Sequence, residues 1–169
     1  MSWLSRRAAC LLLGTLGTPL ASPAQANVLG QASSIALGRV PVRVAIVEGP
    51  LVATRIRALP SGHRLILVAR RLRAAAPPGV LYRLLLDLDP GAALPGEKDP
   101  RDAGIINFYA AVPPGGNPST VSFDITANLR AILAKGGLAH GLTVTIAPME
   151  TPADGADAAI GALELVEEQ

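Results

Sequence analysis

Two histidines, His63 and His140, are the only imidazole side chains in this 169-residue chain. They lie far apart in the sequence, and neither has another histidine a few residues away. Protein zinc and copper sites usually draw several nitrogen or sulfur ligands from closely placed side chains. The sequence therefore predicts no metal site and no bound cofactor.

Carboxylates offer a second kind of metal chemistry, because calcium prefers oxygen ligands. Several acidic residues crowd one loop, namely Asp87, Asp89, Glu97, Asp99 and Asp102. They lack the regular ligand spacing of a calcium-binding loop. A solvated loop is the interpretation we favour, and whether residues 87–102 bind a cation stays open at this point.

Nucleophilic catalysis needs a serine or cysteine beside a base. Ser61 and His63 lie close together on a turn, but the chain has neither a Gly-x-Ser-x-Gly elbow nor a glycine-rich phosphate loop. The one cysteine, Cys10, falls in a leader segment. We predict no catalytic residues and a protein that is not an enzyme.

Residues 1–26 have the organisation of a signal peptide. Arg6 and Arg7 precede a short apolar core, and a small-residue sequence, Ala-Gln-Ala, ends the segment. We predict cleavage between Ala26 and Asn27. The arginine pair also suits the twin-arginine export route, so this route and ordinary secretion both stay open. We expect the mature chain to be periplasmic or secreted.

The mature chain is close to neutral. Arg6 and Arg7 leave with the leader, so the 15 basic residues lose two and equal the 13 acidic ones. With two tyrosines and two phenylalanines, the chain has no basic stacking surface for nucleic acid. No later apolar run approaches the roughly 20 residues of a membrane helix. We predict no nucleic-acid partner and no membrane span in the mature chain.

Arginine is concentrated in the first half of the mature chain. Nine arginines lie from Arg39 to Arg83, with Glu48 as the single acid among them. The favoured interpretation is that their aliphatic stems cover the outer face of strands. The alternative is a surface for a protein partner, since arginine is enriched at interfaces.

Short alternating apolar runs, separated by Pro and Gly, organise the rest of the chain. Strands are predicted at residues 40–46, 51–59, 65–72, 80–88, 105–112, 121–126, 142–146 and 158–166. The pattern predicts an all-β fold with one short helix. Its architecture would be an antiparallel β-sandwich or a jelly-roll-like barrel of about seven to eight strands. We assign it to one domain at residues 39–169, preceded by a segment at 27–38 that is an ordered edge or a lead-in.

The predicted helix lies within residues 119–150, between two strands. Thr126 is placed to cap its first turn, and Gly136 is placed to end it in a left-handed conformation. This strand, helix and strand in succession is the most detailed local prediction that the sequence allows.

This organisation resembles the C-terminal β-sandwich domain that follows the di-copper domain in tyrosinases and polyphenol oxidases. The matching segments are residues 65–72, 78–87, 104–109, 123–126 with the helix that follows, 142–148 and 160–165. The resemblance covers nearly the whole mature chain, although its motifs are patterns of strands and turns. The histidine pairs of the copper domain are absent, so the resemblance implies no oxidase activity.

In that family the domain covers the copper site, can insert a bulky plug side chain, and helps maturation. The resemblance thus implies an exported accessory protein, a partner, shield or maturation factor for a tyrosinase-like type-3 copper oxidase. Tyr109 is the first candidate for a plug or partner contact, because it is predicted on the face opposite Phe108, and Tyr82 is the second. The family's usual aromatic-Gly pair is replaced here by Tyr109 and Ala110. The alternative function is a general extracytoplasmic binding or structural β-sandwich without a copper role.

Overall fold

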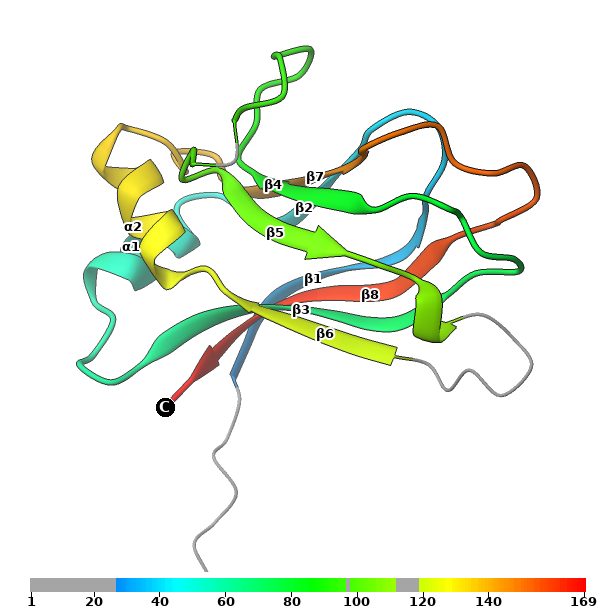
Figure 1. Cartoon of the computed structure of the whole chain (residues 1–169). Coiled ribbons are helices and arrows are strands. Elements are labelled where there is room, and N and C mark those ends of the chain that lie inside the picture. The colour runs from blue at the N-terminus through cyan, green and yellow to red at the C-terminus, as the bar shows by residue number, and fades with distance from the viewer. Residues whose placement is uncertain (1–26, 97, 112–118) are drawn as a thin grey trace, which may run out of the picture.

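The computed structural model describes residues 27–96, 98–111 and 119–169 (Figure 1). The predicted leader, residues 1–26, lies outside the described residues, as does Glu97 of the acidic loop. Asn27 is the first described residue, and the cleavage predicted before it stays a prediction.

Two four-stranded antiparallel sheets pack face to face (Figure 1). The first sheet has the order β1-β8-β3-β6, with bounds Asn27–Ala36, Ala159–Glu168, Arg64–Arg73 and Ser119–Asp124. The second has the order β2-β7-β4-β5, with bounds Val42–Glu48, Gly141–Pro148, Tyr82–Leu86 and Asp102–Ile106. Over the described residues neither sheet closes into a barrel. Of the two predicted architectures, sandwich and jelly-roll-like barrel, the β-sandwich is therefore confirmed.

The period-two pattern of the sequence builds the core between the sheets. On β3, Leu65 and Leu67 are fully buried and belong to the main core. The alternate residues Ile66 and Val68 form a small separate cluster with Val166 of β8. The inner and outer faces of the central strands are thus both apolar, which explains the nearly continuous apolar run in this part of the sequence.

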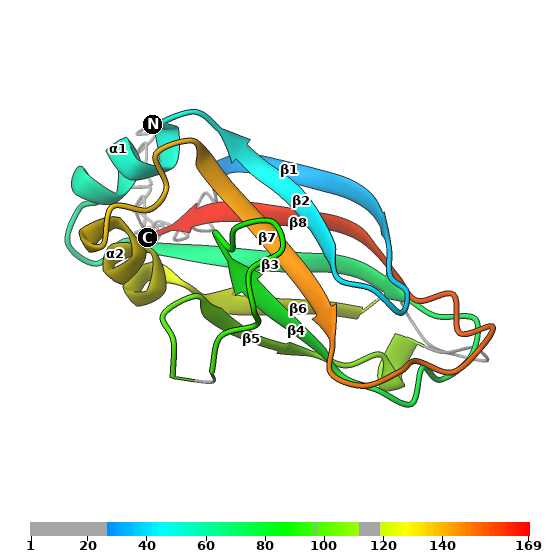
Figure 2. The same ribbon diagram turned by 90° about the horizontal axis from the view of Figure 1, so that it is seen from above.

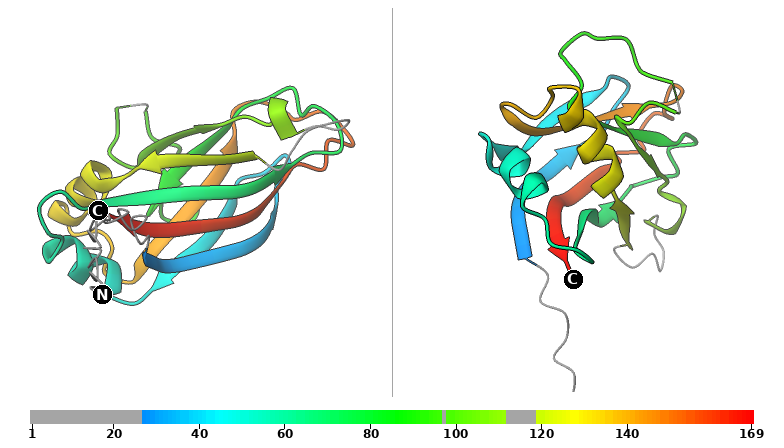
Figure 3. Two further views of the ribbon diagram at one scale, coloured as in Figure 1. Left: turned by 90° about the horizontal axis from the view of Figure 1, so that it is seen from below. Right: turned by 90° about the vertical axis from the view of Figure 1, so that its left-hand side faces the viewer.

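Most connections cross from one sheet to the other, and this gives the sandwich two distinct ends. One end, here called the helical end, carries α1 (Leu51–Arg57) and α2 (Thr126–Ala134), as Figure 2 shows. The opposite end, here called the loop end, carries the connections 37–41, 74–81 and 149–158 and a 3-10 helix at Tyr109–Ala111 (Figure 3).

The strand predicted at residues 51–59 is wrong, because α1 stands there instead. Val52, Thr54 and Ile56 are β-branched residues at every second position, which resembles a strand in the sequence. The buried side chains are Val52, Ala53 and Ile56, which share one face of a helix. The fold therefore has two short α-helices where one was predicted.

The strand predicted at residues 105–112 is also placed differently. β5 ends at Ile106, and the chain turns into the 3-10 helix that contains Tyr109. Phe108 is nevertheless 2% exposed and Tyr109 73% exposed. The two neighbouring rings thus point to opposite environments, as predicted, although not from a strand.

The helix of the 119–150 module is confirmed, but its predicted cap is not. The Thr126 hydroxyl accepts a hydrogen bond from the Leu65 amide at 2.8 Å, which joins α2 to β3. The Asp124 carboxylate accepts from the Thr126 amide at 3.0 Å and so satisfies the start of the helix. Gly136 has the predicted left-handed conformation, with φ of 86°.

Residues 27–36 form the edge strand β1, which pairs antiparallel with β8. Of the two descriptions proposed for residues 27–38, the ordered edge matches this strand. Among the residues the structure describes, no helix is long and apolar enough to cross a membrane.

Candidate ligand and contact site at the loop end

Tyr82 begins β4 and points into the sandwich at the loop end. Its ring packs edge to face on Phe108, with centroids 5.5 Å apart and an angle of 76° between the rings. The side chain is 1% exposed. Its hydroxyl is buried and has no hydrogen-bond partner among the described residues. A buried hydroxyl without a partner is uncommon in folded proteins and needs a physical explanation.

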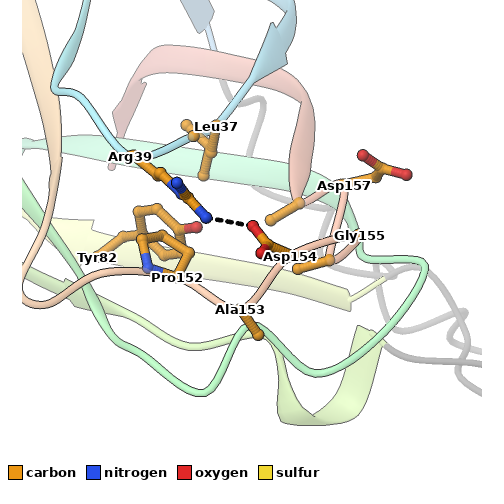
Figure 4. Close-up of a pocket in the computed structure, with 11 residues that line it drawn as sticks. Leu37, Arg39, Tyr82, Pro152, Ala153, Asp154, Gly155 and Asp157 are labelled. Carbon is orange, nitrogen blue, oxygen red and sulfur yellow. Dashed lines mark hydrogen bonds and ion pairs between the residues drawn. The ribbon is translucent and has the colours of Figure 1, made fainter.

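The Tyr82 side chain lines a pocket with a volume of about 160 Å³ (Figure 4), although its hydroxyl is covered. The connections 37–39 and 152–158 form its walls. In Figure 4 the hydroxyl of Tyr82 points toward the ion pair between Arg39 and Asp154. This pair is exposed to solvent, with 62% of the Arg39 side chain and 88% of the Asp154 side chain accessible. The pocket therefore has paired charges at its mouth, while the buried Tyr82 hydroxyl is closed off from it.

Backbone hydrogen bonds hold the pocket walls in place. The Leu37 amide donates to the Ala158 carbonyl at 2.8 Å, and the Ala75 amide donates to the Ala156 carbonyl at 2.7 Å. Asp157 has a positive φ of 44°, so the chain turns sharply between these two carbonyls. The pocket is consequently a fixed part of the fold, shaped by backbone contacts between connections distant in sequence.

Burial raises the pKa of the Tyr82 phenol. The phenol, which is neutral at pH 7 even in an exposed tyrosine, therefore stays neutral to a still higher pH.

Tyr109, the first predicted contact residue, is also at the loop end. At 73% exposed, it is the most exposed of the large apolar side chains described. Tyr82, the second predicted contact residue, lies at the same end but does not protrude. Their different burial gives the two tyrosines different roles: Tyr109 can touch a protein partner, whereas the buried Tyr82 anchors its strand in the core.

At the helical end, the main polar cluster is centred on Glu167 of β8, which is 4% exposed. Arg55 of α1 donates two hydrogen bonds to the Glu167 carboxylate, one of them at 2.7 Å. His63 adds a third contact through Nδ1, at 2.8 Å. Arg55, together with His63, holds the pKa of Glu167 below its usual range. This cluster ties α1 and the turn before β3 to the last strand.

The helical-end cluster changes how His63 is interpreted. Its Nδ1 is taken by Glu167, which gives the ring a structural partner. His140 lies on the exposed turn before β7. No group of three or more histidine, cysteine or acidic side chains that could hold a metal ion is found in the described ranges.

Acidic residues of the loop 87–102 have partners within the fold. Asp102 pairs with Arg83 at 2.8 Å, and Arg83 also donates to the Pro95 carbonyl at 2.7 Å. Asp87 accepts from the Leu138 amide at 2.9 Å, and Asp99 accepts from the Arg101 amide at 2.8 Å. These carboxylates shape the loop and anchor it to β4 and to the turn after α2.

The nine arginines between Arg39 and Arg83 do not form one surface. Four make ion pairs within the described fold, and these are Arg39, Arg55, Arg70 and Arg83. Their partners lie on both sheets and at both ends. Fewer than half of these arginines thus join elements through ion pairs, a role that neither sequence interpretation included.

The pocket itself is the feature that sequence reasoning missed. Arg39 and Asp154 meet from positions 115 residues apart. Tyr82 alternates with Leu84 and Leu86, as in a strand with one buried face, but nothing in the local sequence indicates that its hydroxyl lacks a partner. Only the arrangement of the loop-end connections reveals this.

The described residues thus define an antiparallel β-sandwich without a metal cluster, with a pocket and a protruding tyrosine at one end. Its fold is similar to part of latent aurone synthase, a polyphenol oxidase. The structure of that enzyme from its natural source matches with a TM-score of 0.52 and 16% identity, over 79% of this chain and 26% of that chain. The recombinant enzyme co-crystallised with hexatungstotellurate(VI) matches with a TM-score of 0.50 and 17% identity, over the same shares of the two chains.

This chain therefore spans about a quarter of the length of the structures that it matches. The match is consistent with the C-terminal domain of polyphenol oxidase, which the sequence resembles, and at this identity it shows the fold alone. No protein-family model matches the sequence. No curated protein matches it either.

Proposed function

We propose that this chain is an exported, non-enzymatic accessory protein that docks on a tyrosinase-like type-3 copper oxidase as partner, shield or maturation factor. The fold supports the proposal, because it is similar to about a quarter of a polyphenol oxidase chain. In such an enzyme this domain belongs to the oxidase chain; here it would act as a separate subunit.

The observation that carries the proposal is the position of Tyr109. Its side chain is 73% exposed at the loop end, while the neighbouring Phe108 anchors the same turn in the core at 2% exposure. An aromatic ring held out from a rigid base loses little conformational freedom on binding, which is why tyrosine is enriched at protein interfaces. Tyr109 is thus the residue best placed to enter a cleft in a partner.

Other exposed apolar side chains extend the loop-end surface. Met149 is 49% exposed at the start of the connection to β8. Ile105 on β5 is 45% exposed and lines a shallow hollow with Met149. These side chains would add apolar contact area to that of Tyr109 in a complex with a partner that covers the β5 side of this end.

Co-expression with the tyrosinase-like oxidase of the same organism tests the proposal. We expect the two proteins to co-purify, and we expect the oxidase to contain less copper when this protein is omitted. A matched control is the oxidase co-expressed with Tyr109→Ala, which should weaken co-purification. No complex together with unchanged copper loading would overturn the proposal, and would favour a β-sandwich subunit without a copper role.

A further inference from the structure

β6 is the last strand of the first sheet, so one of its edges has no neighbouring strand among the described residues. Figure 3 shows it at one margin of this sheet, with β1 at the other. The Ile125 amide donates to the Leu65 carbonyl at 3.0 Å, which decides which residues of β6 hydrogen-bond to β3. Because the bonds of an antiparallel pair alternate, the backbone of Phe123 faces β3, whereas the N–H and C=O groups of Ser122 and Asp124 face the free edge.

The other edge strands, β1, β2 and β5, carry features that discourage pairing with another chain. Bulges, charged side chains and local twists are the usual protections of an edge. β1 has a bulge near its start and a positive φ of 55° at Ser34. β2 has a bulge and the charged residues Arg43 and Glu48. β5 begins with Asp102 and has a bulge beside Gly104, whose φ is 132°.

β6 lacks these protections over its described residues. Residues 121–124 pair one to one with β3, and the register shift of this pair falls on the β3 side, where Arg71 has a positive φ of 54°. The strand reads Ser-Thr-Val-Ser-Phe-Asp, without glycine or proline and with one charge, on Asp124 at its end. The side chains of Thr120 and Ser122 are exposed. A regular strand of this composition pairs readily with a further strand.

The chemistry of β6 is complementary to itself. When two copies of β6 run antiparallel about a two-fold axis at Ser122, Thr120 of one copy lies opposite Asp124 of the other. The two carboxylates then stay apart, and each can accept a hydrogen bond from a threonine hydroxyl, whereas like charges placed opposite each other would be unfavourable. Val121 lies opposite Phe123, a β-branched and aromatic pair of the kind that stabilises sheets.

We propose that β6 is an assembly edge, at which two copies of this chain pair antiparallel and join their four-stranded sheets into one continuous sheet. A symmetric pair of this kind closes on itself and leaves β1 as the outer strand on both sides. This inference does not rest on the proposed docking function, since it concerns a different surface and needs no oxidase.

Sedimentation and amide exchange of the purified protein test the proposal together. We expect sedimentation to show a monomer that converts to a dimer as the protein concentration rises. Amide hydrogen exchange followed by NMR then locates the interface. The Ser122 and Asp124 amides should exchange more slowly where the dimer dominates, because they gain hydrogen-bond partners, while the amide of Ser33 on β1 should exchange at the same rate.

Two substitutions at Ser122 should weaken the dimer in different ways. Ser122→Pro removes an N–H that β3 does not use, a position at which edge strands accept proline, and we expect a monomer. Ser122→Lys keeps the backbone and brings two ammonium groups together at the two-fold axis, so we expect association to weaken roughly tenfold or more. Ser33→Lys is the matched control, since it makes the same change on β1, and its association should stay within about a factor of two of the wild type.

Three results would overturn the proposal. The first is a protein that stays monomeric throughout the concentration range in which it is soluble, which would leave the β6 edge to water or to a strand of another protein. The second is a dimer whose formation leaves exchange of the Ser122 amide unchanged. The third is Ser122→Lys associating as tightly as the wild type. None of these results bears on co-purification with an oxidase through Tyr109, so the two proposals fail separately.

Discussion

Glu167 at the helical end and Tyr82 at the loop end are both buried polar side chains, yet their surroundings differ. Glu167 receives hydrogen bonds from Arg55 and His63. Tyr82 has no partner for its hydroxyl among the described residues. The difference concerns these two side chains, because Arg101 Nε and Thr143 Oγ1, near the starts of β5 and β7, are also buried without a partner. Glu167 fastens α1 and the turn before β3 to the last strand, whereas the Tyr82 hydroxyl fastens nothing.

Truncating the apolar core should have the largest effect on stability. Leu129 of α2 is fully buried in the main core. We expect Leu129→Ala to destabilise the fold by about 2–5 kcal/mol, through lost burial and the cavity that remains. Met149→Ala at the loop end, where the side chain is exposed, should change stability by no more than about 0.5 kcal/mol. Urea unfolding measures both, and equal losses would contradict the difference in burial between the two side chains.

The Glu167 cluster should make stability depend on pH at the acidic side. Because its partners lower the pKa of Glu167 in the folded state, the cluster contributes stability above the ordinary pKa of about 4.5. That contribution is lost as the pH falls through the lower, folded-state value. Thermal unfolding from pH 7 to pH 2 should show a smaller acid-side decrease for Glu167→Gln, which is already less stable at neutral pH. A variant with an unchanged acid-side profile would mean that other carboxylates control acid unfolding.

Removing the Tyr82 hydroxyl at the loop end tests whether this buried group lacks a hydrogen-bond partner. If the hydroxyl is buried without a partner, Tyr82→Phe should leave the unliganded protein as stable as the wild type, or more stable by about 1 kcal/mol. If the hydroxyl instead has a hydrogen-bond partner, Tyr82→Phe should lower the free energy of unfolding by about 1 kcal/mol. Urea unfolding separates the two outcomes, and Tyr109→Phe serves as the control with no expected change.

The ion pair at the mouth of the pocket should have the smallest effect. Arg39 and Asp154 are both largely exposed, and exposed pairs contribute little. Asp154→Asn should therefore change the free energy of unfolding by less than about 0.5 kcal/mol. A larger loss would show that the loop end carries stability as well.

The strands were predictable where one residue in two is apolar and the other is polar. This held for β2, β4 and β7, whose alternation is a local property of the sequence. It failed at α1, where β-branched residues at alternate positions resembled a strand. The order of strands in each sheet was not predictable, because it depends on which distant segments share a core.

The two candidate site residues show the same limit. Exposure of Tyr109 followed from its neighbour Phe108, whose ring is needed in the core. The partners of a buried polar group, in contrast, come from anywhere in the chain. Thr126 illustrates this. Its hydroxyl was expected to cap its own helix, but it accepts a hydrogen bond from the amide of Leu65 on β3.

The central claim is that contact with a partner is made at the loop end, and a pair of matched variants tests it most directly. Tyr109 and Leu51 are both exposed apolar residues, 73% and 49% accessible, at the loop end and the helical end respectively. Affinity for the tyrosinase-like oxidase should be measured by calorimetry for Tyr109→Ala and Leu51→Ala. We predict that Tyr109→Ala lowers the affinity tenfold or more, roughly as truncating a residue at the centre of an interface does. Leu51→Ala should change the affinity less than twofold, since Leu51 would lie outside the interface. Wild-type affinity in Tyr109→Ala, or a larger loss in Leu51→Ala, would contradict the claim.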